Sequence, residues 1–146
     1  MKDNQILSLL RKVKAFRKLI FSGVELELGF ELGRTQRGVL MYLAFHGPVP
    51  MNDVSEKFSL AKGSFTQVAD GLEQLGLIER KRCEKDRRII YLETTEKGKE
   101  AAVKIHAATE ERIDLLLSKL PDGDKEKFMD SLTVVAEYID IIRGEN

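Results

Sequence analysis

The sequence predicts a mainly α-helical fold with one short β-hairpin, and two neighbouring patterns indicate it. Apolar residues recur at spacings of three to five between Leu60 and Leu75, which predicts an amphipathic helix. Two strand-like runs follow at once, at residues 77–83 and 87–92, joined by residues 84–86. A helix followed directly by a hairpin with many basic residues is typical of a winged helix-turn-helix.

The distribution of charge is more informative than its total. The 146 residues, the size of one domain with or without helical extensions, carry 24 basic and 24 acidic side chains, so the formal net charge is zero. The total therefore gives no support to nucleic-acid binding. Between Arg80 and Arg88, however, there are six basic and two acidic residues, a local net charge of +4. Support for binding to phosphates therefore comes from this local clustering of charge and not from the total.

Several classes of protein are disfavoured by composition. One cysteine excludes an internal disulfide framework and a cysteine-based zinc finger, and two histidines are too few to indicate a metal site. No run of 18 apolar residues exists, and Arg11 and Lys12 interrupt the N-terminal apolar pattern too early for a signal peptide. No nucleophile–base pair, metal-ligand spacing or phosphate-binding glycine loop is present. We therefore expect that the protein is not an enzyme and that it has no cofactor, metal site or membrane span. We expect a cytoplasmic location.

The first predicted helix covers residues 4–27. Its apolar residues follow one another at spacings of three and four, and they are Ile6, Leu9, Val13, Phe16, Ile20 and Val24. The remaining surface is basic. One interpretation is a core helix with a solvated charged face, and the other is a helix that needs a partner surface.

The next two helices are predicted from their end signals. Thr35 is a predicted N-cap for a helix over residues 36–46, which Gly47 then ends. Pro50 is expected in the first turn of a short helix, where its missing N–H costs nothing. Residues 59–61 are predicted to form the turn into the helix that begins the central pattern.

Glycine and threonine mark the later boundaries. The central helix is predicted to end at Gly76, and Thr95 is predicted to cap a helix that reaches about Lys119. A turn at residues 120–123 precedes a last helix from about Asp124 to Arg143. The apolar arc of this last helix is wide enough to suggest burial on two sides.

With these elements in order, the chain resembles the multiple-antibiotic-resistance regulator (MarR) family. The motifs that carry the resemblance are Gly76-Leu77-Ile78-Glu79-Arg80, Asp86-Arg87-Arg88 and Thr95-Glu96-Lys97-Gly98. The resemblance covers essentially the whole chain, 1–146, as one subunit. It implies a winged helix-turn-helix at about 35–98 and dimerisation helices at about 4–28 and 96–143.

The function that the resemblance implies is sequence-specific binding to double-stranded DNA by a homodimer. Such a transcriptional regulator, a repressor, would bind a pseudo-palindrome whose half-sites lie about 10 bp apart. By the family pattern, the DNA-facing residues are Lys62, Ser64, Thr66 and Gln67 on the helix, and Lys85, Asp86, Arg87 and Arg88 in the wing. The resemblance also implies that Asp86 holds the wing arginine by an ion pair.

The chemistry of these residue types fits those roles. Glutamine can pair with adenine through two hydrogen bonds, and hydroxyl groups are common phosphate ligands. Arginine suits a narrow minor groove, where the negative potential is enhanced. Alternatively, Ser64 and Thr66 are only solvated, and Asp86-Arg87-Arg88 is a polar turn. Phe65 lies on the apolar face and is predicted to be core rather than a base contact.

Two departures from the family pattern affect the DNA-binding helix. Ala61 stands where the family usually has a capping serine, so we expect Ser59 to supply the cap. Gln67 stands where an arginine is common. Together with the zero net charge, Gln67 lends some weight to a second hypothesis, that of a winged-helix module that binds protein rather than DNA.

Control by a signal is the remaining question. Cys83, flanked by Arg82 and Lys85, is either a redox-sensitive thiol or a small residue on an exposed strand. The resemblance also implies a small aromatic effector. The apolar and aromatic residues that could line its pocket, or could equally be core, are Phe16, Phe21, Phe30, Tyr42 and Phe45.

Overall fold

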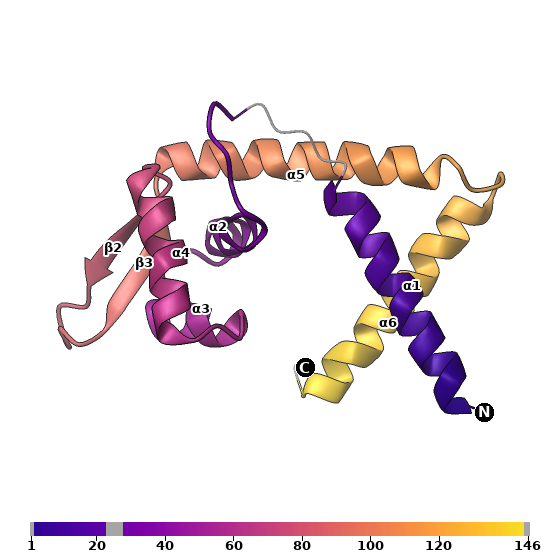
Figure 1. Ribbon diagram of the computed structural model, residues 1–146, viewed down its shortest axis with the longest axis horizontal. Coiled ribbons are helices and arrows are strands. Elements are labelled where there is room, and N and C mark those ends of the chain that lie inside the picture. The colour runs from indigo at the N-terminus through magenta and orange to yellow at the C-terminus, as the bar shows by residue number, and fades with distance from the viewer. Residues whose placement is uncertain (1, 23–27, 145–146) are drawn as a thin grey trace. The chain divides into compact units, whose positions relative to one another are not determined.

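The computed structural model describes residues 2–22 and 28–144 (Figure 1). Its elements are α1 (Lys2–Ser22), α2 (Arg34–His46), β1 (Val49–Pro50), α3 (Met51–Lys57), α4 (Lys62–Gln74), β2 (Ile78–Arg82), β3 (Ile90–Thr94), α5 (Glu96–Leu117) and α6 (Asp124–Arg143). The prediction of a mainly helical fold with a small β-wing is confirmed.

The elements form two compact units. The first, here called the recognition unit, lies within residues 25–108 and contains α2, α3, α4, the three strands and the start of α5. The second, the helical unit, combines residues of 1–24 and 109–146 and contains α1, α6 and the end of α5. None of the helices in the described ranges is long and apolar enough to cross a membrane.

The recognition unit is built around a continuous apolar core. Leu40 of α2, Phe65 and Leu72 of α4, and Leu92 of β3 are each at most 1% exposed and belong to one cluster. Burying a side chain of this size contributes about 1.5–3 kcal/mol. The prediction that Phe65 is a core residue is confirmed, and this core fixes α4 against the sheet.

The sheet has three antiparallel strands in the order β1-β3-β2. The predicted hairpin is present, but its second strand begins at Ile90 rather than Arg87, because the N–H of Ile89 donates to the carbonyl of Asp86 and keeps that segment in the turn. Strand β1 was not predicted from the sequence. Its two residues, paired with Tyr91 and Leu92, are too few to show alternation.

Three predicted helix starts are wrong in detail. Helix α2 begins at Arg34 with Gly33 as N-cap, so Thr35 lies inside the helix, and Gln36 Oε1 accepts the Gly33 N–H at 2.9 Å. Pro50 is the N-cap of α3 rather than its first helical residue. Helix α4 starts after Ala61 with no side-chain cap, so Ser59, at φ +51°, does not supply one.

The C-terminal end of α4 has a Schellman arrangement. Gly76 takes a left-handed φ of +72°, its N–H donates to Glu73 O at 2.9 Å, and the N–H of Leu77 donates to Leu72 O at 3.0 Å. The prediction that Gly76 ends this helix is confirmed.

The start of α5 binds the carbonyls that follow this end. Thr95 Oγ1 accepts the Gly98 N–H at 3.0 Å, which confirms Thr95 as the cap of α5, and donates to Gly76 O at 2.6 Å. The backbone N–H of Thr95 donates to Leu77 O, and Lys97 Nζ donates to Leu75 O. Three successive carbonyls after α4 are thereby satisfied by one segment.

In the helical unit, α1 crosses α6 (Figure 1), and the rings of Phe16 and Phe128 meet edge to face at 5.3 Å. Arg112 Nε donates to Leu19 O at 3.3 Å, which ties α5 to α1. The predicted first helix extended to residue 27, and its residues 23–27 lie outside the described residues. The predicted last helix has the bounds that the structure shows.

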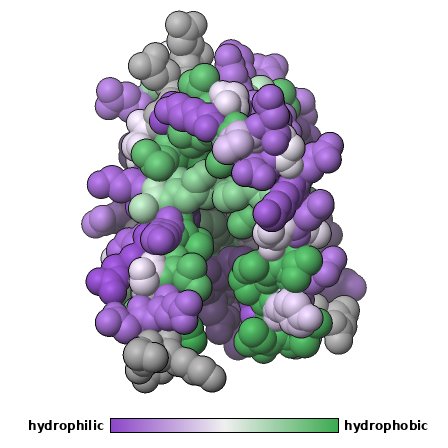
Figure 2. Space-filling view, turned by 90° about the vertical axis from the view of Figure 1, so that its right-hand side faces the viewer, coloured by the Kyte–Doolittle hydropathy of each residue, from purple (hydrophilic) through white to green (hydrophobic). Residues whose placement is uncertain are grey.

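The helical unit exposes a large apolar surface. Helix α6 has no buried residue, and Ile20 is the buried hydrophobic residue of α1 in the described ranges. Figure 2 shows hydrophobic side chains gathered at the surface and bordered by hydrophilic ones. The large exposed hydrophobic residues of these two helices are Ile6, Leu7, Leu9, Leu10, Val13, Leu19, Phe21, Met129, Leu132, Val134, Val135, Tyr138, Ile139, Ile141 and Ile142.

The contact between Gly98 and Leu77 gives a direct stability test. A Cβ at Gly98 would lie 2.0 Å from Leu77 O and 2.9 Å from its carbonyl carbon. Backbone atoms cannot move aside cheaply, so we expect Gly98→Ala to lower the free energy of unfolding by at least about 1–3 kcal/mol. Gly63→Ala is the matched control because nothing lies within 4 Å of its Cβ. It should stabilise by up to about 1 kcal/mol. Denaturant unfolding measures both, and equal effects would contradict this packing.

Candidate nucleic-acid interface

The four residues predicted on the DNA-facing side of α4 share one exposed face. Lys62, Ser64, Thr66 and Gln67 are all exposed, whereas the buried residues Phe65, Ala69 and Leu72 point into the core. Thr66 Oγ1 donates to Lys62 O at 2.8 Å, so its hydroxyl proton is engaged within the helix. The oxygen still has a lone pair and can accept a hydrogen bond from a base edge.

The start of α4 is also open. No described side chain caps its first turn, and the first backbone hydrogen bond of the helix is from Phe65 N–H to Ala61 O, at 2.9 Å. The N–H groups of residues 62–64 therefore have no partner within the helix. Such a helix start carries a partial positive charge and favours an anion such as a phosphate.

Asp86 braces Arg88 at the tip of the wing, by the kind of ion pair that the sequence analysis expected between Asp86 and a wing arginine. Asp86 Oδ1 accepts Nε of Arg88 at 3.1 Å and its backbone N–H at 3.0 Å, and Oδ2 accepts Nη2 at 3.3 Å. The side chain of Arg88 is nevertheless 90% exposed. Lys85 and Arg87 are exposed beside it and have no hydrogen bond or ion pair to the described part of the chain.

The contacts with Arg88 change the pKa of Asp86. The hydrogen bond from the guanidinium of Arg88, followed by that from its backbone N–H, lowers the pKa of Asp86 below the ordinary value. A lowered pKa means that the brace is fully present at neutral pH and is lost only as pH falls through the lowered value.

Two other basic residues of the hairpin are neutralised within the protein. Arg80 pairs with Asp70 at 2.6 Å and with Glu73 at 2.8 Å. Lys81 pairs with Glu93 and Glu79, whose hydrogen bonds and charges raise the pKa of Lys81. The local charge of +4 counted from the sequence therefore overstates what the hairpin offers to DNA. The sequence analysis missed the role of Asp70 and Glu73, although their spacing of three on the polar face of α4 was visible.

The residues considered for signal sensing are dispersed. Cys83 is a half-buried free thiol just beyond β2, and its N–H donates to Ile89 O. Phe30 and Tyr42 pack against the core of the recognition unit, which favours the core interpretation for both. Phe45 is 68% exposed and lies 6.0 Å from the ring of His106.

The remaining two aromatic residues belong to the helical unit. Phe16 packs on Phe128, and the guanidinium of Arg17 lies 6.0 Å from the ring of Phe21. Among the described residues, no group of three or more His, Cys, Asp or Glu side chains could hold a metal ion.

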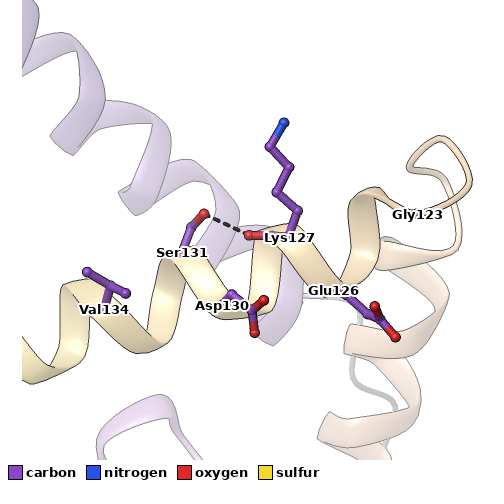
Figure 3. Close-up of a pocket in the computed structure, with 6 residues that line it drawn as sticks. All are labelled: Gly123, Glu126, Lys127, Asp130, Ser131 and Val134. Atoms are coloured by element: carbon purple, nitrogen blue, oxygen red, sulfur yellow. Dashed lines mark hydrogen bonds between the residues drawn. The ribbon is translucent and has the colours of Figure 1, made fainter.

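A shallow depression of about 430 Å³ lies along the start of α6 (Figure 3). Its lining comes from this one helix and its N-cap, and consists of Gly123, Glu126, Lys127, Asp130, Ser131 and Val134. The hydroxyl of Ser131 donates to Lys127 O at 2.7 Å. A depression with two carboxylates and no aromatic residue does not match the pocket expected for an aromatic acid.

The Asp86–Arg88 brace can be tested by titration. We expect the carboxylate of Asp86, followed by carbon-detected NMR, to titrate below the usual range for aspartate. Arg88→Met should raise the midpoint towards that range, because both hydrogen bonds from the guanidinium are lost. Arg87→Met is the control and should leave the midpoint near that of the wild type. Equal midpoints in wild type and Arg88→Met would show that the brace does not form in solution.

Comparison with known proteins identifies the family of the chain. The sequence model of the MarR family matches residues 30–89, which contain α2 to α4, β2 and the turn that follows it, and which end just before β3. The transcriptional regulator MhqR of Bacillus subtilis is 36% identical over 95 residues, which cover 65% of this chain and 66% of MhqR. The present chain thus aligns with about two thirds of the length of that relative.

Solved structures share the fold over nearly the whole chain. A MarR transcriptional regulator from Methanosarcina mazei Go1 superposes with a TM-score of 0.73 at 24% identity, covering 94% of this chain and 99% of that one. FabT of Streptococcus pneumoniae, solved in complex with DNA, gives 0.65 at 18% identity and covers 96% of each chain. The chain belongs to the MarR family of helix-turn-helix transcriptional regulators.

Proposed function

We propose that the protein is a repressor that binds a pseudo-palindromic operator sequence-specifically as a homodimer. The observation that carries this proposal is the pairing of two exposed surfaces in one packed unit. The polar face of α4 lies opposite its core residues, and Arg88, paired with Asp86, lies at the tip of a hairpin whose strands pack on the same core through Ile78 and Leu92. The structure of FabT with DNA supports the proposal, because that protein shares the fold.

The proposed role of α4 is to read the major groove. Gln67 can form two hydrogen bonds with adenine, a contact that discriminates between bases by about 1–3 kcal/mol. Lys62, Ser64 and the free N–H groups of the first turn would bind phosphates and fix the register of the helix. Because Thr66 donates within the helix, it would act as an acceptor.

The proposed role of the wing is to enter the adjacent minor groove. Arg88 is the residue assigned to that groove, since Asp86 restricts its side chain while leaving it 90% exposed. A restrained arginine loses less conformational entropy on binding than a free one. Lys85 and Arg87 would contact the flanking phosphates.

The proposed homodimer would cover the apolar surface of the helical unit. Exposed apolar bands as extensive as those on α1 and α6 are uncommon on monomers and indicate an interaction surface. Residues 4–22 of α1 carry five basic and no acidic residues, whereas α6 carries five acidic and three basic ones. Two copies can therefore pair opposite charges beside the apolar contacts. Such a dimer would present two α4 helices to half-sites about 10 bp apart.

Occupancy of the operator is the proposed means of repression, and no enzymatic step is invoked. A small aromatic effector is included in the proposal as the signal that releases DNA, by shifting the separation of the two recognition helices. The exposed ring of Phe45 is the candidate contact for it in the recognition unit. A shift in the fluorescence or melting temperature of the protein with aromatic acids, abolished by Phe45→Ala, is the expected result.

Binding at different salt concentrations tests the DNA-binding role of the wing. The operator can be selected from random duplexes with the wild-type protein. Loss of Arg88 removes a phosphate-proximal cation, so Arg88→Ala should weaken binding and lower the slope of log K against log[salt] by about 1. Lys104→Ala, an exposed lysine of α5, is the matched control and should leave both unchanged.

Two results would count against this function. Equal affinity and slope for Arg88→Ala and wild type would remove Arg88 from the interface. Failure to select any duplex, or binding that does not depend on salt, would favour the alternative of a winged-helix module that binds another protein.

Sedimentation equilibrium tests the dimer. We expect the wild type to be dimeric at micromolar concentration and the pair of substitutions Val135→Glu and Ile139→Glu to produce a folded monomer. Each substitution would remove the stabilisation of the dimer, about 1–3 kcal/mol, that comes from burying an apolar side chain. Glu137→Gln, on the opposite side of α6, should remain dimeric. A monomeric wild type at all concentrations would overturn the proposed mode of binding.

A further inference from the structure

One arginine joins the wing to the recognition helix by hydrogen bonds. Successive side chains alternate across a strand, so Ile78 and Arg80 of β2 lie on the same side of the sheet. Ile78 is buried in the core at 2% exposure, and Arg80 reaches α4 two residues further along. Its Nη2 lies 2.6 Å from Asp70 Oδ1 and its Nη1 lies 2.8 Å from Glu73 Oε1.

The geometry of this contact requires a guanidinium. Asp70 and Glu73 are three residues apart on α4, so their carboxylates lie side by side about one turn apart. Arginine has a planar fork with separate donors that can bind both carboxylates at once. The side chain of Arg80 is 24% exposed. Its burial acts to lower the pKa of Arg80, but the hydrogen bonds and charges of Asp70 and Glu73 outweigh burial and raise that pKa, so the guanidinium stays charged.

Strand β3 is also paired with β1 at Tyr91 and Leu92, and beyond that pairing the hydrogen bonds of the described residues remain within the hairpin. Cys83 N–H donates to Ile89 O, Ile89 N–H donates to Asp86 O, and Asp86 binds Arg88. Lys81, on the other side of β2, pairs with Glu79 and Glu93 of the two strands. In the described residues, Arg80 is therefore the side chain that joins the hairpin directly to α4 by hydrogen bonds.

Arg80 is poorly placed to bind DNA itself. Both of its terminal nitrogens already donate to carboxylates, and those two negative charges would repel a phosphate brought close to the same guanidinium. The next outward residue on that side of the strand, Arg82, has no such pair in the described structure.

We propose that Arg80, held by Asp70 and Glu73, is a positioning residue that sets the angle between the recognition helix and the wing. This angle allows Arg88 to reach the minor groove while α4 occupies the adjacent major groove. The inference rests on the proposed function, since it assumes that both elements contact one duplex. It adds a residue that acts on DNA binding without touching DNA.

Dimethyl sulfate methylates guanine N7 in the major groove and adenine N3 in the minor groove. Footprinting with this reagent therefore reads the contacts of α4 and of the wing separately, and so distinguishes a positioning role of Arg80 from a general loss of stability. At saturating protein, Arg80→Met should keep the guanine protection due to α4 and lose the adenine protection due to the wing. Its affinity for the selected duplex should fall roughly tenfold. Lys81→Met, the adjacent residue on the same strand, is the matched control and should retain both protections.

A double-mutant cycle gives a second readout. If Arg80 acts by placing Arg88, then Arg88→Ala should cost much less affinity in the Arg80→Met background than in the wild type. Additive losses would show that the two residues act independently and would overturn the inference. If Arg80→Met lowers the folded fraction, Glu73→Gln keeps the Asp70 contact and should reduce the adenine protection partially.

The outcomes distinguish this inference from the proposed function. A wild-type protein that protects neither groove refutes the proposed function itself. A wild-type protein that protects both grooves, with a folded Arg80→Met variant that either keeps both protections or loses both together, refutes only the positioning role.

Discussion

The junction between α4 and α5 is the constraint on which the candidate site depends. The carbonyls of Leu75, Gly76 and Leu77, which follow the end of α4, accept hydrogen bonds from Thr95 and Lys97 at the start of α5. A glycine at position 98 is needed, since a Cβ there would meet the backbone of Leu77. The end of α4 is thereby fixed while its first turn remains open, so the helix presents a rigid polar face.

The distribution of charge follows from the same packing. A protein with zero net charge has little long-range attraction for DNA, so the few cations available must be well placed. In the wing, Arg80 and Lys81 are neutralised by carboxylates of the protein. Arg88 is restrained by Asp86 but exposed. Geometry, rather than total charge, is therefore expected to dominate affinity.

Local signals in the sequence predicted much of this structure, and non-local contacts explain what they did not predict. The spacing of apolar residues located α4, Gly76 and Thr95 marked its junction with α5, and the bounds of α6 were correct. Thr35 was a wrong cap because Gly33 and Gln36 form the start of α2 together. The guanidinium of Arg80 binds Glu73 and Asp70, which lie seven and ten positions earlier in the chain. These contacts depend on how β2 packs against α4, which the periodicity of the sequence does not reveal.

Site-directed photo-crosslinking to the selected operator tests the central claim most directly, because it reads the position of each element on the duplex. A photoreactive side chain in place of Gln67 should crosslink to bases within each half-site. The same probe in place of Arg88 should crosslink to bases that flank the half-sites, on the minor-groove side. Crosslinks from both positions to the same bases, or from neither position to any base, would contradict the account.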